Sequence, residues 1–118
     1  MRDLSGVFKA YDIRGVVGEQ LDSDLVRDVG AAFARQVTEN AVVIGHDMRA
    51  SSPGLAAAFA EGVNREGVDV VMIGLASTDM LYFASGHLNL PGAMFTASHN
   101  PAKYNGICLL YTSPSPRD

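Results

Sequence analysis

A chain of 118 residues is long enough to bury one hydrophobic core and form one domain. Its composition, 47% hydrophobic and 19% charged, is typical of a globular protein, and a net charge of −4 gives no basic surface for nucleic acid or an anionic membrane. No apolar run approaches the roughly 20 residues that span a bilayer, and the N-terminus lacks a signal peptide's apolar core. The single cysteine cannot form an internal disulfide, so we expect a cytoplasmic protein.

The first half of the chain predicts a strand, a helix and a second strand. Residues 7–11 suit a first strand, and residues 12–15 suit the turn that follows it. Asp22 is a good N-cap for a helix of about four turns. Residues 41–45 form a short apolar run, typical of a strand buried on both faces. The apolar residues that recur at helical spacing are Leu25, Val29, Ala32, Phe33 and Val37.

The second half repeats this alternation. Ser52 and Pro53 predict the N-cap and first turn of a helix that ends near residues 66–67. Residues 68–73 and 92–96 predict strands, with a short helix between them that Thr78 or Asp79 caps and that runs through Ser85. Alternating strands and helices indicate an α/β protein with a partly parallel sheet and helices on both faces, hence three layers. In the short helix, the core candidates are Met80, Leu81 and Phe83.

The segment 96–101, Thr-Ala-Ser-His-Asn-Pro, places the hydroxyl of Ser98 beside the imidazole of His99 and the amide of Asn100. It follows the predicted strand 92–95, and open α/β sheets bind their ligands at the carboxyl ends of strands. The alternative is a plain polar turn, because serine, asparagine and proline are common turn residues.

Together with Tyr-Asn-Gly-Ile at 104–107, this segment closely resembles the phosphoserine loop of the α-D-phosphohexomutase family. Three upstream segments resemble other motifs of that family: Lys-Ala-Tyr-Asp-Ile-Arg-Gly at 9–15, Gly-His-Asp-Met-Arg-Ala-Ser-Ser-Pro at 45–53, and the run 74–84. The resemblance implies a three-layer α/β/α domain with a four-stranded mixed sheet, the first of four domains in a longer enzyme. The remaining three domains would be missing from this chain.

The resemblance implies that phospho-Ser98 hands its phosphoryl group to a hexose phosphate, with His99 as a general acid or base or an orienting group. Tyr11, Arg14, Asn100 and Lys103 would bind phosphate or support the loop. The planar guanidinium of Arg14 suits an anionic phosphate, although pairing with Asp12 is the alternative. Mg²⁺ would contact the phosphate on Ser98, with its other ligands outside this chain.

Two positions in these motifs, His46 and Cys108, depart from the family pattern. His46 stands where arginine is usual, and we interpret it as a solvated loop residue rather than a ligand. Cys108 stands where the family has a lysine, a candidate acid/base, and supplies no positive charge. We interpret Asp47 and Arg49 as structural residues that tie their loop to the following helix. The histidines His46 and His87 have no companions at metal-ligand spacing, so we expect no zinc site.

The end of the chain, residues 108–118, breaks from the pattern before it. The run Cys-Leu-Leu-Tyr-Thr-Ser-Pro-Ser-Pro-Arg-Asp resembles an in-frame translation of a transposase-type sequencing adapter. We therefore predict a native domain over residues 1–107, truncated at its C-terminal end, and a non-native tail over 108–118. The apolar run 107–111 predicts a strand by its pattern alone, whatever its origin.

The resemblance favours a phosphomannomutase/phosphoglucomutase fragment that uses a phosphoserine and a bisphosphorylated sugar intermediate. One alternative is a phosphoglucosamine mutase fragment, and another is a non-catalytic domain that binds a phosphosugar or a protein partner. The chain alone is expected to be inactive, because it lacks the groups that bind the metal and the sugar.

Overall fold

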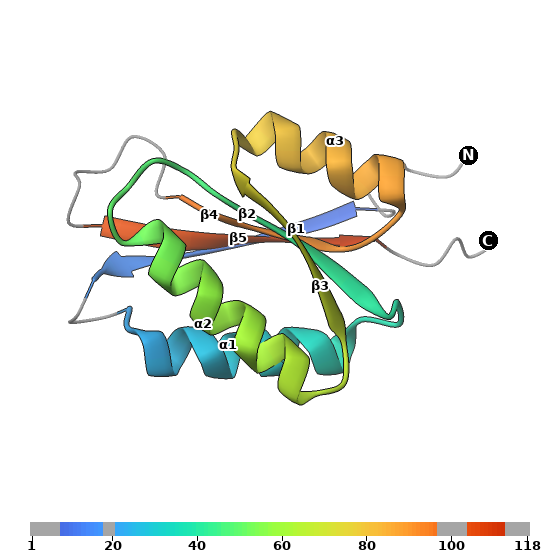
Figure 1. The fold of residues 1–118 in the computed structure, drawn as a ribbon, viewed down its shortest axis with the longest axis horizontal. Coiled ribbons are helices and arrows are strands. Elements are labelled where there is room, and N and C mark those ends of the chain that lie inside the picture. Colours follow the sequence, from blue (N-terminus) through green and yellow to red (C-terminus); the bar gives the residue numbers. More distant parts are fainter. Residues whose placement is uncertain (1–7, 18–20, 97–103, 113–118) are drawn as a thin grey trace.

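The computed structural model describes residues 8–17, 21–96 and 104–112. Their elements alternate between strand and helix before ending on two consecutive strands (Figure 1). In chain order they are β1 (Phe8–Val16), α1 (Ser23–Gln36), β2 (Ala41–His46), α2 (Ser52–Arg65), β3 (Asp69–Leu75), α3 (Thr78–Leu88), β4 (Gly92–Phe95) and β5 (Tyr104–Thr112).

The described strands form one mixed sheet in the order β1-β5-β4-β2-β3. Strands β3, β2 and β4 run parallel, whereas β5 is antiparallel to both β4 and β1. The predicted mixed sheet is therefore confirmed, but it holds five described strands rather than four. The additional strand arises because β5 continues through Thr112 between β1 and β4. The predicted boundary at residue 107 stays a prediction, since the apolar pattern of 107–111 forms a strand whatever its origin.

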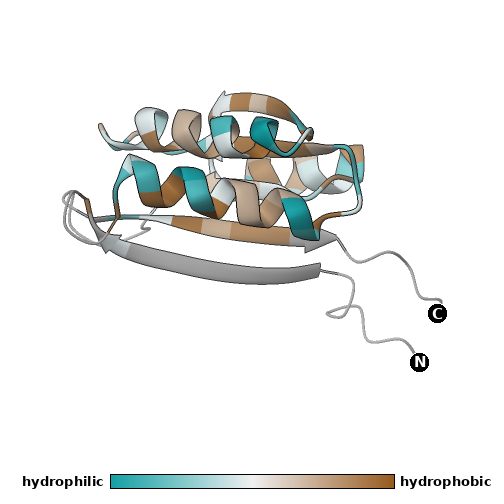
Figure 2. Cartoon of the chain, turned by 90° about the horizontal axis from the view of Figure 1, so that it is seen from below, coloured by the Kyte–Doolittle hydropathy of each residue, from teal (hydrophilic) through white to brown (hydrophobic). Residues whose placement is uncertain are grey.

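Helices cover both faces of the sheet, which confirms the three-layer α/β/α architecture (Figure 1). On one face, α1 and α2 pack over a large core that includes Phe33, Phe59 and Phe95. On the other face, Leu81 of α3 packs on Val43 and Met94. Brown, apolar residues recur along the strands, and along the helices they alternate with teal, polar ones (Figure 2).

Helices α1 and α2 approach each other very closely at two glycines. A Cβ atom on Gly30 would lie 2.3 Å from the carbonyl oxygen of Phe59, and one on Gly62 would lie 2.0 Å from that of Arg27. Any larger side chain would therefore push the helices apart. An ion pair also joins the two helices: Nε of Arg27 in α1 donates to Oε1 of Glu61 in α2 at 2.5 Å.

Several expected boundaries and caps need correction. β1 runs through residues 12–15 instead of turning there, because β5 pairs with it in register from Phe8↔Thr112 to Val16↔Tyr104. Asp22 caps α1 as predicted, accepting from the Leu25 amide at 2.8 Å. Ser51 rather than Ser52 stands at the N-cap position of α2, and its side chain makes no capping hydrogen bond there.

Helix α3 also differs from its prediction. Its N-cap is Ser77, whose side chain accepts from the Met80 amide at 3.1 Å, and the helix continues to Leu88. Leu81 is fully buried as expected, but Met80 is 56% exposed and Phe83 is 73% exposed. These two were wrong as core candidates, because α3 is the single described helix on its face and no described element buries them.

Candidate functional site

The carboxyl ends of β2, β3 and β4 meet at one edge of the sheet, as parallel strands require. His46, the last residue of β2, is in register with Phe95 of β4 and Leu75 of β3. Antiparallel β5 starts at the same edge, where the Thr96 amide donates to the Gly106 carbonyl at 3.0 Å. The segment that joins Thr96 to Tyr104 therefore leaves and re-enters the described structure at this edge.

The predicted nucleophile lies in that connecting segment. Ser98, His99, Asn100 and Lys103 fall within residues 97–103, outside the described residues. Their assignments stay predictions.

Strand β1 brings a further candidate to the same edge. The backbone of Arg14 is in register with Gly106, and Gly15 is in register with Asn105. Tyr11 lies three positions back along β1, opposite Leu109. The topology thus places Arg14 of the first strand beside the start of the last one, at the edge where the Ser98 segment attaches.

A partly buried polar network underlies this edge, and it begins in the loop after β2. The Asp47 amide donates to the Phe95 carbonyl at 3.0 Å. The Asp47 carboxylate accepts from the Arg49 amide at 3.0 Å, from Nε of Arg49 at 3.1 Å and from the Ser52 hydroxyl at 2.5 Å. Asp47 and Arg49 thus tie their loop to the start of α2, which confirms their interpretation as structural residues.

The charge state of Asp47 follows from these contacts. Burial alone would raise the pKa of this carboxyl group, but the Ser52 hydroxyl, the Arg49 amide and the Thr96 side chain all stabilise the carboxylate. The positive charge of Arg49 acts in the same direction. Together they hold the pKa of Asp47 below its ordinary value of 3.8. Asp47 is therefore a fixed negative charge in the network at neutral pH.

The network continues to the start of β5 through a buried amide. Asn105 is fully buried, and its Nδ2 donates to the hydroxyl oxygens of Ser51 at 2.8 Å and Ser52 at 2.9 Å. Its Oδ1 accepts from the Gly106 amide at 2.8 Å. Sequence reasoning gave Asn105 no role of its own, although it stands in the 104–107 motif.

His46 was expected to be a solvated loop residue, and this prediction was wrong. It ends β2, is half-buried, and its Nδ1 lies 3.0 Å from the Asp47 carbonyl oxygen. Cys108 is half-buried on the opposite side of the sheet from α1 and α2, beside the cluster of Val43, Leu81 and Met94.

Metal ligands do not gather within the described ranges: no group of three or more His, Cys, Asp or Glu side chains there could hold an ion. The carboxylate of Asp47 is occupied by Arg49 and Ser52. The described residues do not form a magnesium site by themselves. None of the helices described is long and apolar enough to cross a membrane.

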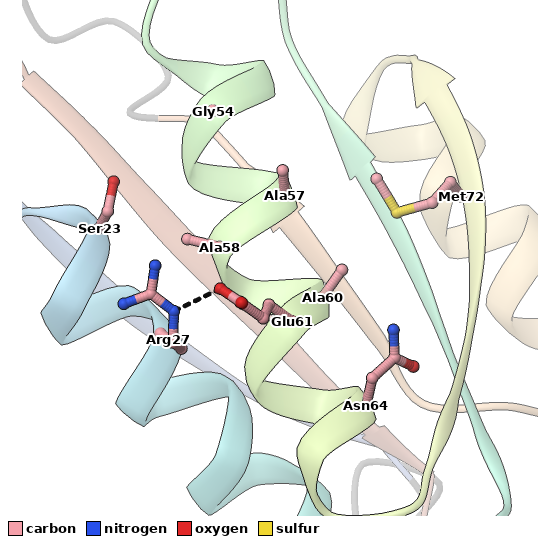
Figure 3. Close-up of a pocket in the computed structure, with 9 residues that line it drawn as sticks. All are labelled: Ser23, Arg27, Gly54, Ala57, Ala58, Ala60, Glu61, Asn64 and Met72. Carbon is pink, nitrogen blue, oxygen red and sulfur yellow. Dashed lines mark hydrogen bonds and ion pairs between the residues drawn. The ribbon is translucent and has the colours of Figure 1, made fainter.

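A surface groove lies elsewhere, along α1 and α2 (Figure 3). Small side chains of α2 line it, and the ion pair between Arg27 and Glu61 joins α1 to α2 beside them (Figure 3). The hydrogen bond from Arg27 lowers the pKa of Glu61, which keeps the pair charged. No member of the polar network around Asp47 and Asn105 lines this groove, so it is separate from the candidate site. Its lining residues are Ser23, Arg27, Gly54, Ala57, Ala58, Ala60, Glu61, Asn64 and Met72.

A three-layer α/β/α domain with a Ser-His-Asn sequence between β4 and β5 matches one known class of domain. The family model described as phosphoglucomutase/phosphomannomutase, alpha/beta/alpha domain I, matches residues 5–116, and the chain belongs to this family.

Curated relatives and a solved structure agree with this assignment. The chain is 46% identical over 110 residues to a protein named phosphohexose mutases in Xanthomonas campestris pv. campestris, covering 92% of this chain and 25% of the relative. It is 44% identical to a phosphomannomutase of Salmonella typhimurium, covering 92% of this chain and 24% of the relative. A crystal structure of a phosphoglucomutase/phosphomannomutase family protein from Burkholderia thailandensis superimposes with a TM-score of 0.77 at 40% identity, over 86% of this chain and 25% of the other. The chain thus spans about a quarter of the length of these relatives.

Proposed function

We propose that this chain is the serine-bearing first domain of a phosphohexomutase that interconverts hexose 1-phosphate and hexose 6-phosphate, with mannose or glucose as the sugar. The observation that carries the proposal is the meeting of three residues at one sheet edge. Arg14 is in register with Gly106, which follows Asn105, and the Thr96 amide donates to the carbonyl of the same Gly106. That edge supports both ends of the segment that contains Ser98. Membership of the family supplies the reaction class.

In the proposed reaction, the phosphoryl group on Ser98 is transferred to a free hydroxyl of the sugar phosphate. The bond between phosphorus and the seryl oxygen breaks, and a bond between phosphorus and the sugar oxygen forms. The sugar hydroxyl releases its proton to a base, and the seryl oxygen regains a proton. The resulting bisphosphate turns around, and its other phosphoryl group returns to Ser98, so the net reaction is an isomerisation.

Each proposed role belongs to a residue of this chain. His99 would carry or orient the proton, and the guanidinium of Arg14 would bind a phosphate oxygen pair. Asn100 and Lys103 would support the loop, with Tyr11 further along β1. Magnesium would assist the complete enzyme by neutralising phosphate charge, with the phosphate on Ser98 as this chain's contribution to its binding. We further propose that the enzyme works in the cytoplasm.

A chimera tests the proposal directly. Residues 1–107 would replace the matching segment of the Xanthomonas campestris relative, which supplies the rest of the enzyme. A coupled assay with glucose-6-phosphate dehydrogenase should detect conversion of glucose 1-phosphate. Ser98→Ala should lower kcat by at least about 1000-fold, because removing a covalent nucleophile abolishes the reaction path.

The matched control is Ser23→Ala, which removes an exposed hydroxyl at the first residue of α1 and should leave kcat unchanged. A Ser98→Ala chimera as active as its parent would overturn the proposed role of Ser98. The 118-residue chain by itself should show no turnover in the same assay, and turnover there would contradict its dependence on missing domains.

A further inference from the structure

The amide of Asn105 joins elements that are far apart in the sequence. It stands at the second position of β5, yet it donates to the hydroxyls of Ser51 and Ser52 at the start of α2. It is fully buried, and both functional atoms of its amide are satisfied. A buried amide with this many partners has one favoured orientation, because each alternative leaves polar groups unpaired.

The same chain of bonds reaches the other end of the 97–103 segment. The Ser52 hydroxyl, which accepts from Asn105, donates to the Asp47 carboxylate at 2.5 Å. The Thr96 side chain also stabilises that carboxylate, and the Asp47 amide donates to the carbonyl of Phe95, the residue before Thr96, at 3.0 Å. The path from Asn105 through Ser52 and Asp47 to Thr96 therefore links the residue that precedes the segment to a residue just after it.

The path is fixed to a rigid element. Ser52 is the first residue of α2, and the buried apolar face of that helix packs in the main core. The pair of Asp47 and Arg49 is only 21% and 12% exposed, so solvent screens it weakly. The two ends of the 97–103 segment are consequently fastened to the N-terminal end of a core helix and to each other.

We propose that Asn105 is a positioning residue for Ser98, acting through Ser52 and Asp47. This inference rests on the proposed role of Ser98 as phosphoryl carrier. Asn105 touches neither substrate nor phosphate in this role; it fixes where the segment that carries Ser98 begins and ends. Because phosphoryl transfer depends on alignment, a displacement of about 1 Å at the nucleophile lowers the rate by roughly 100-fold.

The first test measures anchoring in the 118-residue chain itself by amide hydrogen exchange. Asn105→Ala should speed exchange of the Thr96 and Asp47 amides about tenfold beyond any change in the globally protected amides of β2. Those two amides report on the edge because they donate to the carbonyls of Gly106 and Phe95. Ser51→Ala removes one acceptor of Asn105, so it should accelerate exchange of the same two amides more weakly. It replaces Asn105→Ala in the test if that variant does not fold.

Ser85→Ala is the matched control. Ser85 is also fully buried, and its hydroxyl donates to the Leu90 carbonyl beneath α3, on the other face of the sheet. The control loses a buried hydrogen bond without touching the path to Ser98. If it accelerates the Thr96 and Asp47 amides as much as Asn105→Ala does, the anchoring role is refuted.

The second test measures catalysis in the chimera described above. Asn105→Ala should lower kcat by about 10- to 100-fold while KM stays within about threefold, whereas Ser85→Ala should change neither by more than about twofold. Equal kcat losses in both variants would overturn the positioning role. An inactive unmodified chimera would instead count against the proposed function. The hydrogen-exchange comparison would then be the test of whether Asn105 anchors the two ends of the segment.

Discussion

Replacing Gly62 with alanine should destabilise the protein, because the two helices on one face of the sheet touch through their backbones there. The added Cβ would lie 2.0 Å from the Arg27 carbonyl oxygen and 2.9 Å from the Ala31 amide nitrogen. Ordinary contact begins at 3.4 Å, so α1 and α2 would have to separate by roughly 1.4 Å, the shortfall from 2.0 to 3.4 Å. Neither obstacle is a flexible side chain that can rotate away.

The size of the effect follows from two opposing terms. Overpacking a well-packed contact costs about 1–3 kcal/mol, and a clash between backbones belongs at the upper end. Alanine gains about 1 kcal/mol over glycine in helix propensity. We therefore expect Gly62→Ala to lower the free energy of unfolding by about 2 kcal/mol.

Gly54 provides the matched control in the same helix. A Cβ there meets nothing within 4 Å, so Gly54→Ala keeps the propensity gain without the clash and should stabilise the protein by about 0.5–1 kcal/mol. Urea unfolding followed by circular dichroism would measure both variants, with equal m values as the condition for comparing them. If Gly62→Ala is as stable as Gly54→Ala, the close approach of α1 and α2 at this point is refuted.

Three further variants test the charge network, a helix cap and the outer face of α3. Asp47→Asn should lower the free energy of unfolding by about 1–3 kcal/mol at pH 7. Because the pKa of Asp47 in the folded protein lies below 3.8, this destabilisation should be complete above that pH and should vanish as the pH falls through the lowered pKa. Asp28→Asn, on the exposed surface of α1, should not destabilise the protein in this way. Asp22→Ala should cost about 1 kcal/mol in urea unfolding, and Asp22→Asn should retain most of the cap; equal losses would argue against the capping bond. Phe83→Ala should change stability by less than about 0.5 kcal/mol, whereas Phe59→Ala, fully buried between two aromatic rings, should cost about 3–5 kcal/mol.

Local patterns in the sequence predicted much of the fold. Asp22 marked the start of α1 because a capping side chain acts on the amides that follow it directly. β2 and β4 were recognisable since strands buried on both faces are continuously apolar. The length of β1 escaped prediction because its partner, β5, lies at the other end of the chain.

In the candidate site, too, contacts between neighbouring residues could be predicted from the sequence, whereas contacts between distant residues could not. The motif around Ser98 and the tie between Asp47 and Arg49 were readable from neighbouring residues. The bond from Asn105 to Ser52 crosses 53 positions, so no local pattern reveals it. Met80 and Phe83 were misjudged because apolar character shows that a side chain prefers burial, whereas exposure depends on what covers α3.

The pairing of β1 with β5 has a consequence for how the chain folds. Phe8 is in register with Thr112, so β1 cannot pair with β5 until nearly all of the described chain exists. By contrast, the helices α1 and α2 and strands β2 and β3 are neighbours in sequence and can assemble earlier. Closing so long a loop costs entropy before any contact repays it, which slows folding. Strand β1 is therefore expected to dock last, onto a core that has already formed without it.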